Sequence, residues 1–419
     1  MFNRKNWNTS QGRNRISTEL VEKIIRRFRF VRGCTLSFKK PGPRQTLIYD
    51  RSGSDLLLNI LDPSRTGVLD IRGESLNVHA LIRMVRRRKI SLFHYTTAYI
   101  SFVKPRIIVT TTDTDINFYR LKSTFPEILT VAIQNGIRSD LGPQCDSGFF
   151  ISLKKLSEST HLSADFICTL GGAIATNYRA CVDAKFLTTG ALKNNSLEMK
   201  DGHSENELLF VSQYPPKWPD NSATCLYYKS YPLSYSLVYS AELLVIQFLA
   251  TYCRQNQIQL TICGKRNSDS VNERNFYSNA LGDMPFEFIP SNTPSDSYKQ
   301  IARSKIVVTI DSTLGYESLA RAKRTAMFSI RGKLTSESIG VPLDDLNFGW
   351  PLELPDTGPF WTNTASEAEF SRILNYLMTV SDADWSNEIG KYTEDLMVFD
   401  PGNTVLRDLL QRLGADLTN

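Results

Sequence analysis

The chain has 419 residues, more than one hydrophobic core usually supports, so two domains of ordinary size are expected. Hydrophobic residues make up 41% and charged residues 22%, as in a soluble globular protein, and no apolar run reaches the length that crosses a bilayer. The first residues are polar and basic without the apolar stretch of a secretion signal, which favours a cytoplasmic protein. The seven cysteines include no C-x-x-C pair and the four histidines show no ligand spacing, so neither disulfides nor a bound metal is expected.

Residues 1–44 are expected to form a basic, helical or partly disordered lead-in, with residues 18–30 its most helical part. From residue 45 to residue 200, short apolar runs alternate with helical stretches, which indicates a parallel, Rossmann-like sheet. The expected strands of this first domain are residues 45–49, 67–71, 106–111, 128–133, 166–170 and 185–188.

Polar side chains follow five of these strands. Loops favour such residues in any protein, which suffices to explain one or two of them. The carboxyl ends of parallel strands, however, meet at one edge of the sheet, where open α/β proteins place ligand and catalytic groups. Their recurrence therefore favours a ligand site formed by Asp50; Arg72, Glu74 and Asn77; Asp113 and Asp115; Gln134, Asn135, Gly136 and Arg138; and Asn194.

Two groups of basic residues, Arg26–Arg32 and Arg83–Lys89, concentrate positive charge in this half of a chain whose net charge is +6. The simplest interpretation of either group alone is a solvated helix face. Together they could instead attach the protein to anionic lipid headgroups at the inner membrane face, or bind a phosphorylated substrate. No nucleic-acid-binding motif accompanies them, so nucleic acid is not an expected partner.

A polar, turn-rich stretch at residues 196–206 marks the expected domain boundary, after which the alternation of strands and helices restarts. Ser212 follows the first strand of this half, and Lys265 and Arg266 follow the second. The second domain is expected over 207–350, with strands at 208–211, 259–262, 286–289, 306–310 and 325–330 and an apolar helix at 240–253.

Residues 351–419 are expected to be a C-terminal helical segment, in which a helix at 366–379 packs back on the body. The predicted fold class is therefore α/β, with two Rossmann-like domains whose parallel sheets face a cleft.

The most informative stretch is Asp311-Ser312-Thr313, which lies between the buried strand 306–310 and a predicted helix. Small hydroxyl side chains at a helix N-terminus leave backbone N–H groups and the positive dipole end facing outward, which suits a phosphate. Glu317 follows Thr313 by four residues and is expected on the same helix face, where its carboxylate could bind sugar or ribose hydroxyls. An ordinary capped helix explains an isolated Ser-Thr pair, but the accompanying Asp and Glu favour a ligand site.

These segments resemble bacterial surface carbohydrate biosynthesis proteins. Arg72-Gly73-Glu74 with Asn77 is similar to an Arg-Gly-Glu-x-x-Asn segment of that family, and Asp311-Ser312-Thr313 with Glu317 looks like its donor segment. Further similar segments are Asp113 to Asp115 with Phe118, Gln134-Asn135-Gly136 with Arg138, and Gly190 with Asn194-Asn195. One departure is Thr114, where the family pattern has Asn after the aspartate. The resemblance implies the GT-B arrangement of glycosyltransferases, in which the C-terminal domain binds a nucleotide-activated donor and the N-terminal domain binds the acceptor.

The resemblance and the residue chemistry together imply transfer of a sugar from a nucleotide donor to a surface-glycan or lipid-linked acceptor, without a metal or other cofactor. The implied donor-binding residues are Asp311, Ser312, Thr313, Glu317, Lys265, Arg266 and Ser212. The implied acceptor-binding residues are Arg72, Asn77, Gln134, Asn135, Gly136, Arg138 and Asn194. An inverting transfer needs one general base, for which the candidates are Asp113, Asp115, Asp50 and Glu74. Asp113 ranks first because Asn117 and Gln134-Asn135 could orient it.

Three alternatives share parts of this reading. A nucleotide-sugar epimerase would have the same donor site, and a polyol-phosphate transferase would use another donor on the same architecture. A non-catalytic scaffold of a polysaccharide assembly complex would use the basic groups for docking. The number of polar strand ends argues against the scaffold, which has no need for them.

Overall fold

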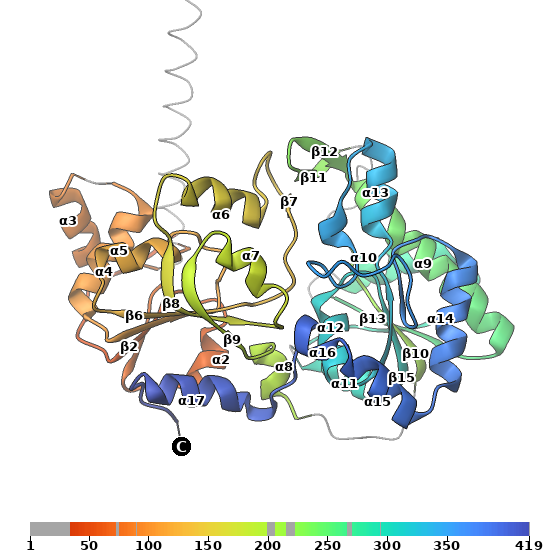
Figure 1. The fold of residues 1–419 in the computed structure, drawn as a ribbon. Helices are drawn as coiled ribbons and strands as arrows, with labels where there is room; N and C mark the ends of the chain where they lie inside the picture. Colours follow the sequence, from red (N-terminus) through yellow and green to blue (C-terminus); the bar gives the residue numbers. More distant parts are fainter. Residues whose placement is uncertain are drawn as a thin grey trace, which may run out of the picture. The chain divides into compact units, whose positions relative to one another are not determined.

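The computed structural model describes residues 34–72, 75–88, 90–198, 206–214, 223–265, 270–293 and 295–418. Met1–Thr110 with Thr418–Asn419 form one compact unit, and Thr111–Leu417 form a second. Figure 1 labels the helices and strands along the chain. The expected helix at 18–30, the group Arg26–Arg32, Lys89, and the predicted site residues Glu74 and Arg266 lie outside the described residues.

Three parallel strands form the main sheet of the first unit. β2 (Thr46–Ile48) pairs with β3 (Thr66–Val68) on one side and with β5 (Ile107–Thr110) on the other. All residues of β2 and β5 are buried, as their apolar sequences predict. A separate parallel pair joins β1 (Thr35–Ser37) to β4 (Ser75–Asn77). The helices of this unit are α2 (Ser54–Leu58), α3 (Val78–Arg86) and α4 (Leu92–Val103).

The second unit begins with another parallel set, in which β8 (Ser163–Thr169) lies between β6 (Leu129–Ile133) and β9 (Asp183–Thr188). The strands predicted at 128–133, 166–170 and 185–188 are present with shifted ends. The accompanying helices are short and comprise η1 (Phe118–Arg120), α5 (Leu121–Thr124), α6 (Phe149–Ser157), α7 (Ala175–Arg179) and α8 (Leu192–Ser196).

A six-stranded parallel sheet is the largest sheet of this unit, in the order β14-β13-β10-β15-β16-β17. Its strands are β10 (Asn206–Val211), β13 (Leu260–Cys263), β14 (Glu287–Ile289), β15 (Ser304–Thr309), β16 (Arg324–Phe328) and β17 (Trp361–Thr362). The fold class is therefore α/β with Rossmann-like parallel sheets, as predicted. The expected boundary at 196–206 falls inside the second unit, between this sheet and the β6-β8-β9 set.

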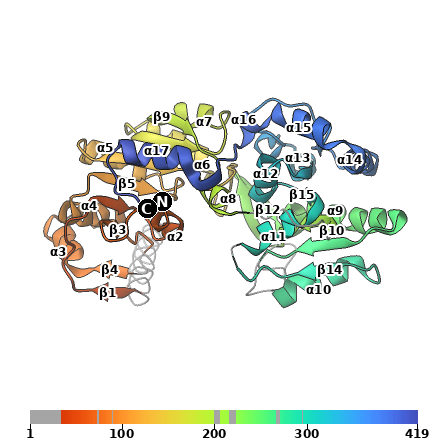
Figure 2. The same ribbon diagram turned by 90° about the horizontal axis from the view of Figure 1, so that it is seen from below.

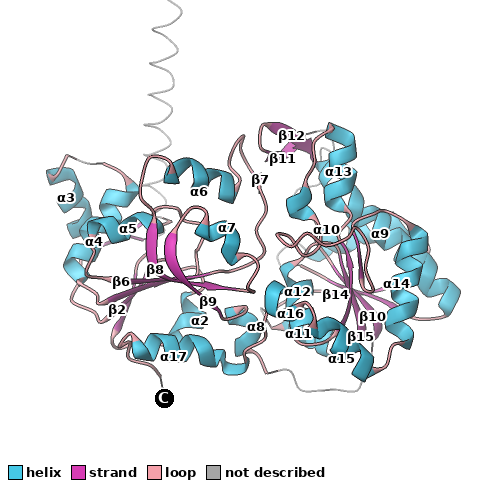
Figure 3. Ribbon diagram, viewed as in Figure 1, coloured by secondary structure: helices cyan, strands magenta, loops and turns pink. Residues whose placement is uncertain are grey.

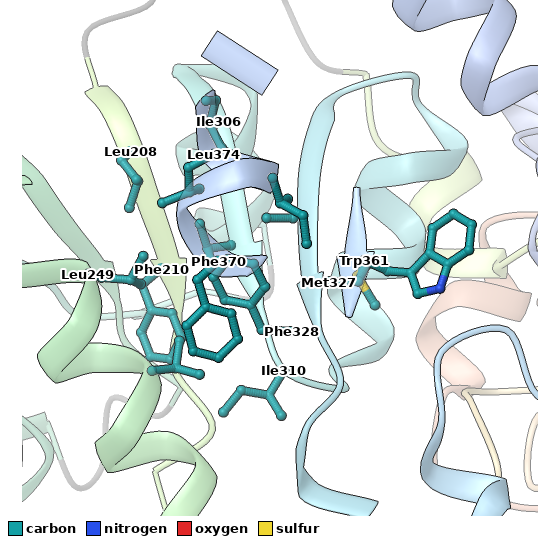
Figure 4. Packing of buried hydrophobic residues seen from close by; sticks show 14 of the residues in the cluster. Leu208, Phe210, Leu249, Ile306, Ile310, Met327, Phe328, Trp361, Phe370 and Leu374 are labelled. Atoms are coloured by element: carbon teal, nitrogen blue, oxygen red, sulfur yellow. The ribbon is translucent and has the colours of Figure 1, made fainter. Parts of the chain in front are cut away.

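Helices cover both faces of the six-stranded sheet, because its strands are apolar on both sides (Figure 3). Leu208 and Ile306 point to the face that carries α9 (Tyr235–Asn256) and α14 (Glu367–Thr379), where Phe328 and Phe370 stack with ring centroids 4.3 Å apart (Figure 4). The intervening residues Leu209 and Val307 point to α11 (Asp296–Ala302) and α12 (Thr313–Ala320). Residues alternate between the two cores along each strand, since the side-chain period of a strand is two.

The sequence did not predict a small antiparallel sheet in this unit. β11 (Thr224–Tyr228) and β12 (Tyr231–Ser234) form a hairpin, and β11 also pairs with the two-residue strand β7 (Leu141–Gly142). The helices that the sequence analysis did not place include α10 (Ser270–Leu281), α13 (Arg331–Ile339) and η3 (Asp344–Leu346).

The C-terminal segment contains α14, α15 (Asp382–Gly390), α16 (Thr393–Leu396), η4 (Pro401–Asn403) and α17 (Thr404–Arg412). α14 buries Phe370, Ile373 and Leu374 in the core beside β16. Among the described residues, α9 alone is long and apolar enough to cross a membrane, which contradicts the expectation that no stretch reaches that length. Its Val245 and Leu249 are fully buried in the same core, so it packs as a core helix of this unit.

Candidate functional site

The carboxyl ends of the six-stranded sheet carry most of the predicted donor residues. Numbered in chain order from β10, the strands lie in the order 3-2-1-4-5-6, which is typical of doubly wound nucleotide-binding sheets. The connections leave β10 and β15 in opposite directions, and such sheets bind ligands in the crevice at this switch point. Gln213 follows β10 and Asp311 follows β15, so both lie at the switch point.

A pocket of about 230 Å³ opens at this edge of the second unit. Four strand-end residues line it, namely Gln213 after β10, Lys265 after β13, Asp311 after β15 and Arg331 after β16. The other lining residues are Ile137, Arg138, Ser139, Leu141, Leu226, Val238, Tyr239, Thr313, Tyr316, Asp345, Leu346 and Asn347. The predicted site residues Arg138, Lys265, Asp311 and Thr313 are thus brought to one pocket.

The first turn of α12 reaches this pocket through Thr313. The helix begins here because Ser312 has an extended backbone and its hydroxyl accepts the N–H of Leu314 at 3.3 Å. Gly315 allows the helix to lie close to its sheet, since a Cβ at this position would fall 2.3 Å from the side chain of Thr309. Thr313 Oγ1 also accepts the backbone N–H of Ile137 at 3.2 Å, so the two sequence segments singled out separately, 134–138 and 311–313, meet.

Arg138 lines the pocket as a firmly held cation. Its Nε donates to Asp113 Oδ2 at 3.0 Å, and its Nη2 donates to Oδ1 of the same carboxylate. Burial by itself would lower the pKa of Arg138, but the carboxylate beside it outweighs that effect and raises the pKa, so the guanidinium stays charged. Within the described part of the chain Nη1 makes no hydrogen bond, which leaves its donors available to a ligand.

Asp113 itself is completely buried. Besides Arg138, its carboxylate accepts the hydroxyl of Tyr178 at 2.6 Å and the backbone N–H of Asn135 at 3.1 Å. A carboxylate with no exposed surface and three donating partners is poorly placed to take a proton from a substrate. This geometry fits a positioning role for Asp113 better than the predicted role of general base.

Arg331 and Asp311 form a second arginine–aspartate pair at the pocket. Arg331 Nε donates to Asp311 Oδ2 at 2.7 Å, Nη2 donates to Gln213 Oε1 at 2.8 Å, and Nη1 donates to the carbonyl of Val238. Burial opposes the charge of Arg331, but Asp311 outweighs it and raises the pKa of the guanidinium. Arg331 thereby links the ends of β10 and β15 with the first part of α9.

Asp345 is the pocket carboxylate that has no ion-pair partner among the described residues. Its Oδ2 accepts the backbone N–H of Asp140 at 2.5 Å, and its Oδ1 has no hydrogen-bond partner in that part of the chain. Burial raises the pKa of Asp345 to about 6, although the hydrogen bond from Asp140 opposes the shift. The group is therefore mainly ionised at neutral pH and can accept a proton close to that pH.

A buried network of polar side chains holds two of the loops that line the pocket. Ser212 Oγ donates to Glu273, and the hydroxyl of Tyr277 lies 2.7 Å from Ser212 Oγ and 2.5 Å from Glu242 Oε1. The two carboxylates accept backbone N–H groups of the pocket loops, Glu273 from Lys265 at 2.8 Å and Glu242 from Gln213 at 2.9 Å. Ser212, a predicted donor-binding residue, is only 4% exposed and belongs to this supporting network instead of the pocket lining.

Glu317 is also absent from the pocket lining. Its Oε2 accepts the hydroxyl of Tyr298 on α11 at 2.6 Å. Burial raises the pKa of Glu317 to about 7, and the Tyr298 hydrogen bond only partly offsets that shift. Thr313 and Glu317 both lie on α12, as predicted, but the Glu317 side chain packs towards α11. Its contact with a sugar hydroxyl stays a prediction.

Several predicted acceptor-binding residues hold loops and helices in place. Gln134 donates to the carbonyl of Gly136 and accepts the N–H of Leu170, both at 3.0 Å. Asn194 Oδ1 accepts a hydrogen bond from Arg321 Nε at 2.6 Å, and Asn194 Nδ2 donates to the carbonyl of Glu317 at 3.3 Å. These contacts fix the loop after β6 and the position of α12, and roles towards an acceptor stay predictions.

The other predicted residues have equally local contacts. In the first unit, Asp50 accepts Arg72 Nε at 2.9 Å, and Asn77 caps α3 by accepting the N–H of His79 at 3.1 Å. In the second unit, Asp115 accepts the backbone and side-chain N–H groups of Asn117 at 3.0 and 3.1 Å. The structure places Asp50, Arg72 and Asn77 in a different unit from the pocket.

Arg331, Tyr239 and Asp345 line the pocket but were not predicted as site residues from the sequence. Arg331 follows the strand at 325–330 directly and would have been found by applying the strand-end criterion to every strand. Tyr239 and Asp345 have no local signal, because α9 and η3 bring them to the pocket only in the folded chain. In the described part of the chain, no group of three or more His, Cys, Asp and Glu side chains is arranged to hold a metal ion.

Comparison with solved structures identifies GT-B proteins. HepE from Anabaena, solved in complex with UDP, is 13% identical over 88% of this chain and 98% of its own, with a TM-score of 0.50. The wall teichoic acid polymerase TagF is 10% identical over 97% of this chain and 98% of its own, with a TM-score of 0.44. Sucrose-phosphate synthase from Thermosynechococcus elongatus is 12% identical over 85% of each chain, with a TM-score of 0.46. At such identities these likenesses concern the fold alone. The chain therefore has an α/β fold of the GT-B type, with two Rossmann-like domains.

The family is shown by the sequence itself. A family described as "putative O-antigen biosynthesis protein" matches residues 131–414, about two thirds of the chain, and the chain belongs to that family. The resemblance to surface carbohydrate biosynthesis proteins is thereby confirmed. A search of curated proteins finds no match to this sequence.

Proposed function

We propose that the protein is a glycosyltransferase that moves a sugar from a nucleotide-activated donor to a surface-glycan or lipid-linked acceptor. The observation that carries this proposal is the pocket at the switch point, where Arg138 and Lys265 lie with the first turn of α12. Guanidinium, ammonium and helix N-terminal N–H donors that converge on one spot suit a phosphate. The same groups would stabilise the charge that develops on the leaving phosphate, so the proposed transfer uses them in place of a metal ion.

The dimensions of the pocket suit part of a donor. Its volume of about 230 Å³ is below the range of about 300–1,000 Å³ that is common for complete small-molecule sites. We assign the phosphate and the adjoining sugar to it. Membership in an O-antigen biosynthesis family supports carbohydrate chemistry, and the UDP held by HepE makes UDP the first nucleotide to test.

Asp345 is the proposed general base for the acceptor hydroxyl. It lines the same pocket, its Oδ1 is not engaged within the described residues, and its pKa of about 6 suits proton transfer at neutral pH. It replaces Asp113, whose carboxylate is occupied by Arg138, Tyr178 and Asn135.

The proposal is tested by a thermal-shift panel with UDP, GDP, CDP, CMP and dTDP on the wild-type chain, Lys265→Met and Lys305→Met. A nucleotide at a hundred times its Kd stabilises the folded state by about 2.7 kcal/mol, which is readily measured. Lys265 lines the pocket, whereas Lys305 is an exposed lysine on β15 outside the pocket lining and serves as the matched control. Stabilisation by one nucleotide that Lys265→Met weakens and Lys305→Met preserves would support the donor site.

The alternatives give different results. Conversion of a UDP-sugar without any acceptor would identify an epimerase, and a response to CDP-glycerol alone would identify a polyol-phosphate transferase. No response to any nucleotide would contradict the transferase and favour a scaffold.

A further inference from the structure

Exposed apolar side chains gather in one region of the first unit. Among the described residues the exposed large hydrophobic side chains number eight, and six of them are Leu36, Phe38, Ile82, Val85, Ile90 and Leu92. Phe38 is 71% exposed and Ile90 is 64% exposed. Exposed apolar residues that are scattered singly need no explanation, but a group of neighbours marks an interaction site.

Contacts within the unit place the segment after β1 beside α3. α3 begins directly after β4, the partner of β1, so the residues that follow β1 lie beside the helix (Figure 2). The ring nitrogen Nε2 of His79 on α3 is 3.0 Å from the carbonyl oxygen of Phe38. Ile82 and Val85 are three residues apart and share one face of α3. Ile90 lies in the link between α3 and α4, and Leu92 is the first residue of α4.

Basic side chains border the apolar group. Lys39, Lys40 and Arg86, Arg87 and Arg88 are all exposed. Lys40 and Arg83 lie over the same ring, that of Phe102, at 5.7 and 4.8 Å from its centroid, which ties the segment after β1 to α3. Residues 34–45 and 75–104 contain no aspartate or glutamate, so no acidic side chain of these segments offsets this charge.

We propose that this β1–α3 patch, made of the six apolar side chains together with Lys39, Lys40 and Arg86–Arg88, docks on an anionic lipid bilayer. Apolar side chains within a cationic border match the layers of a membrane surface, where acyl chains lie below negatively charged headgroups. A second copy of the chain is the poorer partner, because a symmetric interface would place these cations against each other. The sequence offered only positive charge for this role, and the exposed apolar group is the new observation. The inference does not rest on the proposed function.

The test is sedimentation of the full chain with phosphatidylcholine vesicles that contain about a third phosphatidylglycerol, and with vesicles of phosphatidylcholine alone. Each basic side chain near an anionic surface contributes about fivefold in partitioning, so Arg86→Gln with Arg87→Gln should weaken binding about 25-fold. Lys154→Gln with Lys155→Gln removes two exposed cations from α6 in the second unit and is the matched control.

The apolar part is tested with Phe38→Ser and Val85→Ser together, against Val271→Ser, an equally exposed apolar residue of the second unit. The double variant should lose at least tenfold in binding even at about 0.5 M salt, where charge attraction is screened. All the altered side chains are exposed, and unchanged thermal unfolding confirms that each variant folds.

Wild-type binding to anionic vesicles that both patch variants lose and both controls keep would support the proposal. Three outcomes would overturn it: no binding of the wild-type chain, binding that the patch variants retain, or equal binding to neutral vesicles.

Discussion

Asp113→Asn is the substitution that best separates a positioning carboxylate from a catalytic one. The change keeps the size of the side chain but removes the charge that holds Arg138, and it turns an N–H donor towards a guanidinium that also donates. The carboxylate is fully buried and the Arg138 side chain is only 15% exposed, so solvent offsets little of the loss. Removing one partner of a buried ion pair costs about 3–5 kcal/mol. We expect Asp113→Asn to reduce the free energy of unfolding by an amount in this range at pH 7.

The assay is urea unfolding followed by circular dichroism, with Asp115→Asn as the control. Asp115 is partly exposed, and its carboxylate accepts N–H groups of the neighbouring Asn117 instead of a buried guanidinium, so its substitution should cost about 1 kcal/mol or less. Arg138→Met should also lower the free energy of unfolding. The double variant should lose less free energy than the two single variants together, because removal of both side chains leaves no unpaired buried charge. A free energy of unfolding for Asp113→Asn within about 1 kcal/mol of the wild-type value would contradict a structural role for this ion pair. A folded, stable and inactive Asp113→Asn would instead return this residue to the role of base.

Three further predictions concern buried groups. The pKa of Glu317 is about 7 in the folded chain, against an ordinary value of 4.5. The folded state therefore gains stability from the protonated side chain below about pH 4.5, and loses this contribution as the pH rises to 7. Above pH 7, Glu317→Gln should be more stable than the wild type by about 3 kcal/mol. Melting temperatures from pH 5 to 8 measure this, and a difference that does not vary with pH would contradict it. Asp345→Asn should lower kcat about 10²- to 10⁴-fold with little change in KM. It should also abolish the fall in rate that the wild type shows as the pH drops below about 6. A change in KM alone would exclude the base role. Gly171→Ala should destabilise by about 1–3 kcal/mol, since its Cβ would fall 2.2 Å from the carbonyl oxygen of Asp395, whereas Gly390→Ala, with open space around it, should not.

Much of the α/β fold could be predicted because buried parallel strands are marked by local sequence. Runs such as Ile306 to Ile310 are β-branched at every position and apolar at all but Thr309, which is typical of a strand covered on both faces. The small sheet could not be predicted in the same way. β7 has two residues, and its partner β11 lies more than 80 positions further along the chain, so its pairing depends on tertiary structure. α9 was predicted too short, because its ends, Tyr235–Tyr239 and Arg254–Asn256, continue the helix beyond the most apolar stretch that marked it in the sequence.

The candidate site was predictable to the extent that it follows strand ends. Arg138, Lys265, Asp311 and Thr313 all come shortly after strands and do line the pocket. Spacing along a helix is weaker information, since it shows which residues share a face and not what that face contacts. Glu317 illustrates this limit, because its side chain meets Tyr298 on α11 and not the pocket.

The two arginine–aspartate pairs explain how so many polar groups can be buried beside one pocket. Asp113 and Asp311 each come two or three residues after a strand, and each pairs with an arginine that follows the next strand, Arg138 or Arg331. A buried carboxylate alone would be costly, but a guanidinium satisfies it with two donors and keeps others. Lysine could not do this as well, because its single ammonium has no planar fork. Each pair is neutral as a whole, and Arg138 still presents the N–H donors of Nη1, so the pocket can be assembled before a ligand arrives without accumulating positive charge. Lys265 lines the same pocket and brings an ammonium group to it, so substitution of Lys265 tests phosphate binding without breaking either arginine–aspartate pair.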